Sequence, residues 1–162
     1  MPESVLGLPL HPLVVHAVVV LVPLTSILAI VVAISPDRRA RLGWLTWLLA
    51  TGTLGATYAA RVSGATLEQV LYPQVLPPLV AAHKQLGLNT IWFVLALWLA
   101  VTALLLIDFD RRRSSGVNSP VLPTIVAVVA ILVAMGATGQ VLYTGWAGVK
   151  SKWTGVVSSE ER

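Results

Sequence analysis

Four long apolar runs dominate the sequence and leave little chain outside them. They cover approximately residues 12–34, 42–62, 86–107 and 120–144. A helix of roughly 20 apolar residues crosses the hydrocarbon core of a bilayer, so each run is long enough to span a membrane. Hydrophobic residues make up 56% of the chain, charged residues 11%, and the mean hydropathy is +0.82. Because this leaves too little polar surface for a soluble globule, we predict an all-α integral membrane protein, a four-transmembrane-helix bundle.

The remaining segments are too short to form a second domain. Residues 1–162 are therefore predicted to form a single membrane domain. The outer loop 63–85 is rich in apolar residues and is predicted to lie on the bundle. Pro78 in this loop is also suited to the first turn of a helix, which would place His83 in the second turn of an early third helix. The tail 145–162, which contains tryptophans and lysines, is predicted to lie in the membrane interface.

Two compact arginine clusters predict the orientation in the membrane. Arg38, Arg39 and Arg41 lie between the first two runs, and residues 111–113 follow the third. Lys and Arg concentrate in cytoplasmic loops, so both termini are predicted to lie outside, with the chain in the cytoplasmic (inner) membrane of a bacterium. The net charge of +4 is spread over the loop ends, which does not indicate nucleic-acid binding. The expected partners are the lipid bilayer and other membrane subunits or further copies of the chain.

All three histidines are predicted to lie toward the same outer surface. Pro12 marks a helix start, so His11 lies at the membrane surface, whereas His16 lies more than one turn inside. An ionisable side chain within a membrane indicates a functional site. The chain has no cysteine, and two neutral imidazoles from facing helices are the axial pair that a b-type haem needs in a helical bundle. We predict that His16 and His83 bind a haem b and that His11 assists.

Further side chains are predicted to support this site because they lie near the outer helix ends. These are Tyr58, Arg61, Gln140 and Tyr143.

Two other functions remain open on the same residues. His16 can instead hydrogen-bond to a carbonyl or a tyrosine and fix the helix packing, which predicts a structural or accessory subunit of a larger membrane complex with no cofactor. Alternatively, two or three imidazoles can bind copper or zinc at the periplasmic face.

Small residues on the second and fourth runs predict helix-packing surfaces, because they let two backbones approach closely where no hydrophobic force drives helices together. We find no internal sequence repeat. The predicted packing residues are Gly52, Ala56, Ala60, Gly64, Gly136 and Gly139.

The sequence contains no hydrolase, NTPase or transporter signature. No glycine-rich phosphate loop, serine nucleophile elbow or pair of broken helices is present. Asp108 and Asp110 lie beside an arginine cluster and not in an apolar run, so they do not form a carboxylate pair for acid–base catalysis inside the membrane. Electron transfer is the most that the sequence indicates as an enzymatic activity.

Three motifs resemble a widespread bacterial family of small four-helix membrane proteins classed as a domain of unknown function. They are LHPLVVH at 10–16, HKQLG at 83–87 and GATGQVLYTGWAGV at 136–149. The resemblance places weight on His11, Pro12, His16, His83 and Gly87. Relatives are sometimes fused to Rieske or c-type cytochrome domains, which implies electron transfer at or near the membrane. Many relatives follow the second histidine with Phe-Pro, where this chain has Ala17 and Val18.

Overall fold

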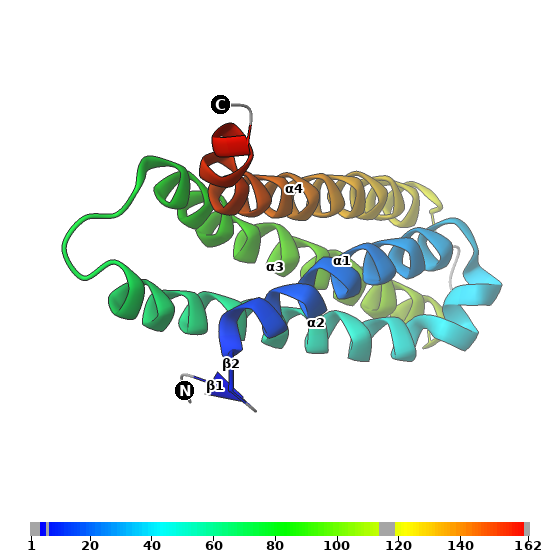
Figure 1. Cartoon of the computed structure of the whole chain (residues 1–162). Helices are drawn as coiled ribbons and strands as arrows, with labels where there is room; N and C mark the ends of the chain where they lie inside the picture. The colour runs from blue at the N-terminus through cyan, green and yellow to red at the C-terminus, as the bar shows by residue number, and fades with distance from the viewer. Residues whose placement is uncertain (1–3, 6, 114–118, 161–162) are drawn as a thin grey trace.

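The computed structural model describes residues 4–5, 7–113 and 119–160, with four long helices in the described part of the chain. A short antiparallel hairpin precedes them, and its strands β1 (Ser4–Val5) and β2 (Leu8–Pro9) have two residues each. The helices are α1 (Leu10–Ile34), α2 (Pro36–Leu71), α3 (Pro78–Arg113) and α4 (Val121–Glu160). They run antiparallel in chain order and form an elongated bundle (Figure 1). The all-α, four-helix prediction is confirmed at this level.

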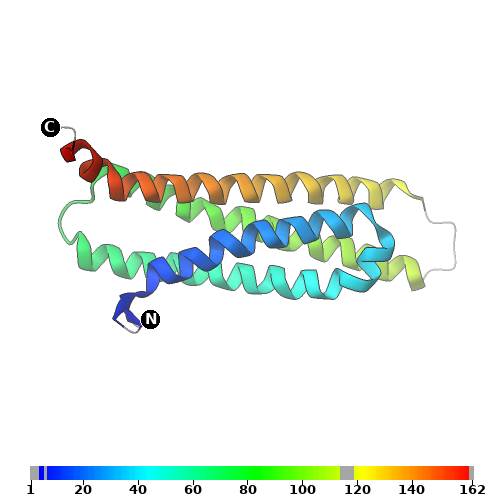
Figure 2. The same cartoon turned by 45° about the vertical axis from the view of Figure 1, so that its right-hand side comes forward.

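Each helix packs along two neighbouring helices and lies diagonally across the bundle from the third. Both α1 and α3 pack against α2 and α4, whereas α1 and α3 barely touch. Both described chain ends and the segment 72–77 lie at one end of the bundle (Figure 2). We call this the histidine end, because α1 and α3 begin there with His11 and His83. The opposite end is the arginine end.

The helices extend further than the apolar runs. The predicted outer loop 63–85 is wrong, because α2 continues to Leu71 and α3 begins at Pro78, which leaves only residues 72–77 between them. The early start of α3 at Pro78 is therefore confirmed. A 36-residue helix is about 54 Å long, well beyond the hydrocarbon thickness, so helical hydrogen bonding continues where apolar sequence stops.

The predicted interfacial tail 145–162 is also helical as far as it is described. It continues α4 to Glu160, and residues 161–162 lie outside the described part of the chain.

Buried positions on α1 and α3 follow one heptad pattern, with alternating steps of four and three residues that keep a seam facing the bundle interior. Each buried heptad position of α1 has a buried counterpart 72 residues later, on α3. The buried pairs are Val18 and Thr90, Val22 and Val94, Thr25 and Leu97, Ala29 and Val101, and Val32 and Leu104.

A second constant offset, of 84 residues, relates α2 to α4. The buried pairs are Thr46 and Ala130, Ala50 and Ala134, Thr53 and Ala137, Thr57 and Val141, and Ser63 and Ala147. The α1–α2 hairpin is thus equivalent to the α3–α4 hairpin, and an approximate twofold rotation about the long axis of the bundle relates them. The sequence hides this repeat because most paired residues differ in type.

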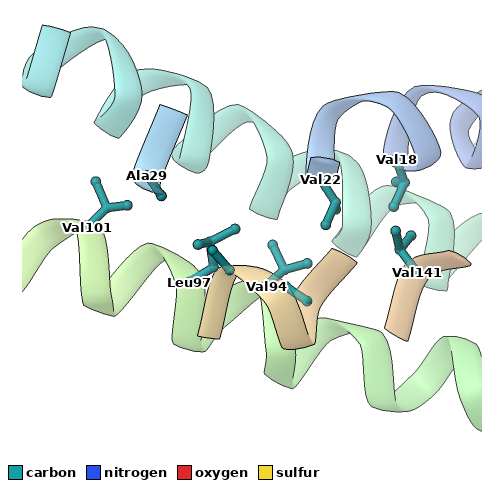
Figure 3. Packing of buried hydrophobic residues seen from close by; sticks show 9 residues of the cluster. Val18, Val22, Ala29, Val94, Leu97, Val101 and Val141 are labelled. Atoms are coloured by element: carbon teal, nitrogen blue, oxygen red, sulfur yellow. The ribbon is translucent and has the colours of Figure 1, made fainter. Parts of the chain in front are cut away.

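The core at the centre of the bundle is aliphatic. Val22, Val94 and Leu97 are almost completely buried, and their side chains point into the space between the helices (Figure 3). Thr25 on α1 meets Thr53 on α2 in this core, with their Oγ1 atoms 2.8 Å apart. Large apolar side chains cover much of the outer surface, which is the distribution expected of a bundle in lipid.

Three helices of the described chain, α1, α3 and α4, are long and apolar enough to cross a membrane. Helix α2 falls short by composition, because its inward face contains threonines, glycine and a buried arginine. Arg39 donates from Nε to the Val32 carbonyl at 2.9 Å and from Nη2 to the Ala33 carbonyl at 3.4 Å. It thereby satisfies carbonyls that the end of α1 leaves without helical partners.

The predicted packing stripe on α2 does not form one surface. Steps of four residues rotate the stripe by about 40° each, so Gly52 and Gly64 lie roughly 120° apart around the helix. Ala56 and Ala60 pack beside the core cluster, and Gly64 contacts His11. Gly52 is exposed with no atom near it.

The two predicted packing glycines of α4 also differ. Gly136 lies against the Phe93 ring, whereas Gly139 is exposed and faces open space.

Candidate histidine site

His11 and His83 occupy equivalent positions at the histidine end. They are separated by the same 72 residues that relate the buried positions of α1 and α3. His11 is the second residue of α1, and His83 is the sixth residue of α3. Both side chains are half-buried. His83 is therefore the counterpart of His11 in the other half of the bundle.

His11 reaches from α1 onto α2. Its Nδ1 lies 3.0 Å from the Ala60 carbonyl oxygen and 3.3 Å from Ser63 Oγ. The imidazole ring lies on Gly64, where a Cβ atom would stand 2.9 Å from His11 Cε1. Real Cβ atoms do not approach this closely, so the absence of a side chain at Gly64 makes room for the ring.

His83 repeats this arrangement from α3 onto α4. Its Nδ1 lies 3.0 Å from the Thr144 carbonyl oxygen. Its ring lies on Gly148, where a Cβ atom would stand 3.0 Å from His83 Cε1. Thr144 and Gly148 are the counterparts of Ala60 and Gly64, because each lies 84 residues later in the chain, as the buried positions of α4 lie 84 residues after those of α2. Gly148 was not predicted from the sequence, because the offset of 84 becomes visible only from the buried positions of α2 and α4.

The hydrogen bonds define which ring nitrogen carries the proton. A carbonyl oxygen can only accept, so Nδ1 of His11 and Nδ1 of His83 each donate. In the neutral imidazole, Nε2 then has a free lone pair. Neither Nε2 has a hydrogen-bond partner among the residues that the structure describes. Metal-binding histidines typically show this pattern, with the second nitrogen fixed by a carbonyl.

A positive charge on His83 would disfavour a positive charge on His11. Within the described residues, no group of three or more His, Asp or Glu side chains is placed to hold a metal ion. His11 and His83 are the candidate ligands at the histidine end.

Gly87, which lies on α3 one turn after His83, has open space where a side chain would stand. It lies one turn from His83 on the inward face of α3, followed along the same face by the buried Thr90. Gly87 is half-buried, yet a Cβ atom there would meet no atom within 4 Å. Its counterpart on α1 is Val15. A side chain at Gly87 would therefore enter open space one turn from His83.

His16 does not face the bundle interior, and the prediction that it does is wrong. Its side chain is exposed, and its Nδ1 lies 2.6 Å from the Pro12 carbonyl oxygen of the same helix. The inward heptad of α1 passes through His11, Val15 and Val18. A residue five positions after His11 is rotated by about 140° from it, so the helix cannot turn both histidines inward.

Of the predicted supporting polar side chains, Gln140 alone bonds to the residue whose carbonyl accepts from His83. It donates from Nε2 to the Leu86 carbonyl at 3.1 Å and to Thr144 Oγ1 at 3.4 Å. Tyr58 and Arg61 are exposed on α2. Tyr143 is also exposed and stacks on Trp146, with ring centroids 5.8 Å apart.

Comparison with known proteins identifies the family. The chain belongs to the DUF2231 family, which is described as a predicted membrane protein, and the family model matches residues 7–161. No curated protein and no solved structure matched the chain. The match covers all four helices, so the protein is a membrane protein with a helical bundle, from a family whose function is unknown.

Proposed function

We propose that this protein is a redox-associated membrane subunit that binds one b-type haem between His11 and His83. The observation that carries the proposal is the symmetric pair of imidazoles, each with Nδ1 hydrogen-bonded to a helix carbonyl and Nε2 free. A haem iron takes four ligands from its porphyrin and needs only two from the protein. It would supply one-electron chemistry, because its iron alternates between the ferrous and ferric states.

Residues at the histidine end would hold such a group. His11 and His83 would bind the iron through Nε2, and the carbonyls of Ala60 and Thr144 would hold the two rings in orientation. The open space at Gly87, one turn from His83, supports the proposal. A structural zinc site normally has four protein ligands, so the two-imidazole set favours haem over zinc.

The proposal also assigns a topology. Helix α2 runs beside α1 and α3, which are both long and apolar enough to span a membrane, so we take it as the fourth span. Arg38 and Arg41 are exposed at the arginine end, which favours this end as cytoplasmic. The histidine end and both termini then lie on the outer side of a bacterial cytoplasmic membrane.

Absorption spectra of the purified protein test the haem. The protein is expressed with ample haem, and its oxidised and reduced spectra are recorded together with an elemental analysis. Bands of a six-coordinate b-type haem are expected at one haem per chain. His11→Ala and His83→Ala should each change the bands, whereas His16→Ala, a histidine on the exposed face, should leave them unchanged.

The same measurement separates the other functions. Copper or zinc in place of iron would support the metal-binding alternative. A folded protein with neither haem nor metal would reject the proposal and favour an accessory subunit without a cofactor.

A further inference from the structure

We infer that the two imidazoles hold their ligand unequally, with His83 fixed and His11 releasable, so that a small external molecule can replace His11 on the bound iron. This inference rests on the proposed haem site. It follows from differences between two halves of the bundle that are otherwise equivalent.

A network of polar side chains supports His83. The carbonyl that accepts from His83 belongs to Thr144, whose Oγ1 lies 3.2 Å from Thr90 Oγ1 and 3.4 Å from Gln140 Nε2. Gln140 also ties the Leu86 carbonyl of α3 to α4 at 3.1 Å. His83 is therefore followed on α3 by two residues, Leu86 and Thr90, that are hydrogen-bonded to α4.

The equivalent positions around His11 cannot form this network. The counterparts of Thr90, Gln140 and Thr144 are Val18, Ala56 and Ala60, which have no side-chain hydrogen-bonding groups. The one added polar partner of His11 is Ser63 Oγ at 3.3 Å, and this hydroxyl also bonds to the Ala60 carbonyl at 3.1 Å.

The position of each histidine in its helix reinforces the difference. His11 is the second residue of α1, and Pro9 at the N-cap makes no side-chain hydrogen bond to the helix. The first turn of a helix lacks internal partners for its N–H groups and frays most easily. His83 lies in the second turn of α3, where the adjacent Lys84 donates to Glu68 Oε1 of α2 at 2.7 Å.

Release of His11 changes coordination without a redox step. If the bond between the iron and His11 Nε2 broke, that nitrogen would regain its lone pair. A small neutral molecule with a lone pair of its own, such as carbon monoxide, would then form the new bond to ferrous iron. The histidine end would thus respond to a diatomic gas.

Carbon monoxide added to the reduced protein tests this asymmetry. The wild-type protein should bind the gas with a change in its absorption bands. His11→Ala should retain haem and bind carbon monoxide about tenfold faster, whereas His83→Ala should lose at least about tenfold in haem affinity. Gln140→Ala should weaken haem retention in the same direction as His83→Ala.

Two outcomes would overturn the inference while leaving the proposed haem intact. One is a haem-loaded wild-type protein that does not bind carbon monoxide. The other is equal behaviour of His11→Ala and His83→Ala. Absence of haem in the wild-type protein would instead reject the proposed function.

Hydrogen exchange on the wild-type protein without haem measures the same difference and does not depend on any variant folding. Backbone amides of residues 13–16 should exchange at least about tenfold faster than those of residues 83–88, because the first turn of α1 opens locally. Equal protection of the two segments would overturn the inference.

Discussion

His11 and His83 rest on glycines that are themselves equivalent in the two halves of the bundle. A Cβ atom at Gly64 would stand 2.9 Å from His11 Cε1, and one at Gly148 would stand 3.0 Å from His83 Cε1. In both cases the ring also bonds to the carbonyl four residues before the glycine. Each half of the bundle therefore carries the same histidine–glycine contact.

This contact predicts that Gly64→Ala and Gly148→Ala displace the rings. Each added methyl group would overlap a buried part of an imidazole, and overpacking of this kind costs about 1 to 3 kcal/mol. Thermal unfolding in detergent should show the loss, and the haem bands should weaken with it.

Gly52→Ala is the matched control, because Gly52 lies on the same helix and faces open space. It should be neutral or slightly stabilising, since Ala favours a helix over Gly by about 1 kcal/mol. Equal effects at Gly52 and Gly64 would mean that ring contact does not matter.

The open space at Gly87 predicts a variant that blocks the proposed ligand and spares the fold. Gly87→Leu places a large side chain where no atom lies within 4 Å of the Cβ position. Haem content per chain should fall, while the unfolding temperature of the protein without haem stays the same or rises because Leu is the better helix former. Full haem occupancy in this variant would show that the space is not used.

The sequence was sufficient for the number of helices, their apolar character and the early start of α3 at Pro78. It was not sufficient for the direction in which each histidine points. Around His16, the residues on every side of α1 are apolar, because lipid is as apolar as the bundle interior. Periodic hydrophobicity therefore does not mark the inward face, and packing against α2 and α4 decides it.

The internal repeat was hidden for a related reason. Thr53 is equivalent to Ala137, and Thr25 is equivalent to Leu97, so polar and apolar residues exchange at the same buried positions. Small threonines suit close helix packing in a membrane because each hydroxyl can bond to a carbonyl of its own helix. Thr53 does so with the Leu49 carbonyl at 2.7 Å. Only the constant offsets of the buried residues reveal the repeat.

The Thr25–Thr53 contact predicts a measurable coupling between α1 and α2. Their Oγ1 atoms lie 2.8 Å apart, and both side chains are fully buried. Thr25→Val, Thr53→Val and the double variant should give a coupling free energy of about 0.6 kcal/mol, the average for hydrogen bonds between membrane helices. Unfolding in detergent measures it.

Thr124→Val is the control for that cycle. Thr124 is exposed, and its hydroxyl bonds only to the Pro120 carbonyl at 2.8 Å within the described structure. Combined with Thr53→Val, it should show no coupling. A coupling as large as that of the buried pair would indicate an effect of threonine removal that does not depend on their contact.

The two ends of α2 give a direct test of the proposed fourth span. The chain contains no cysteine, so a single one can be introduced at an exposed position near either end. Asp37→Cys reports on the arginine end, and Gln74→Cys reports on the histidine end. A membrane-impermeant maleimide applied to intact spheroplasts should label only Gln74→Cys, and permeabilised cells should label both. Labelling of both residues in intact spheroplasts would show that α2 does not separate two compartments, and labelling of Asp37→Cys alone would reverse the orientation that the arginine clusters favour.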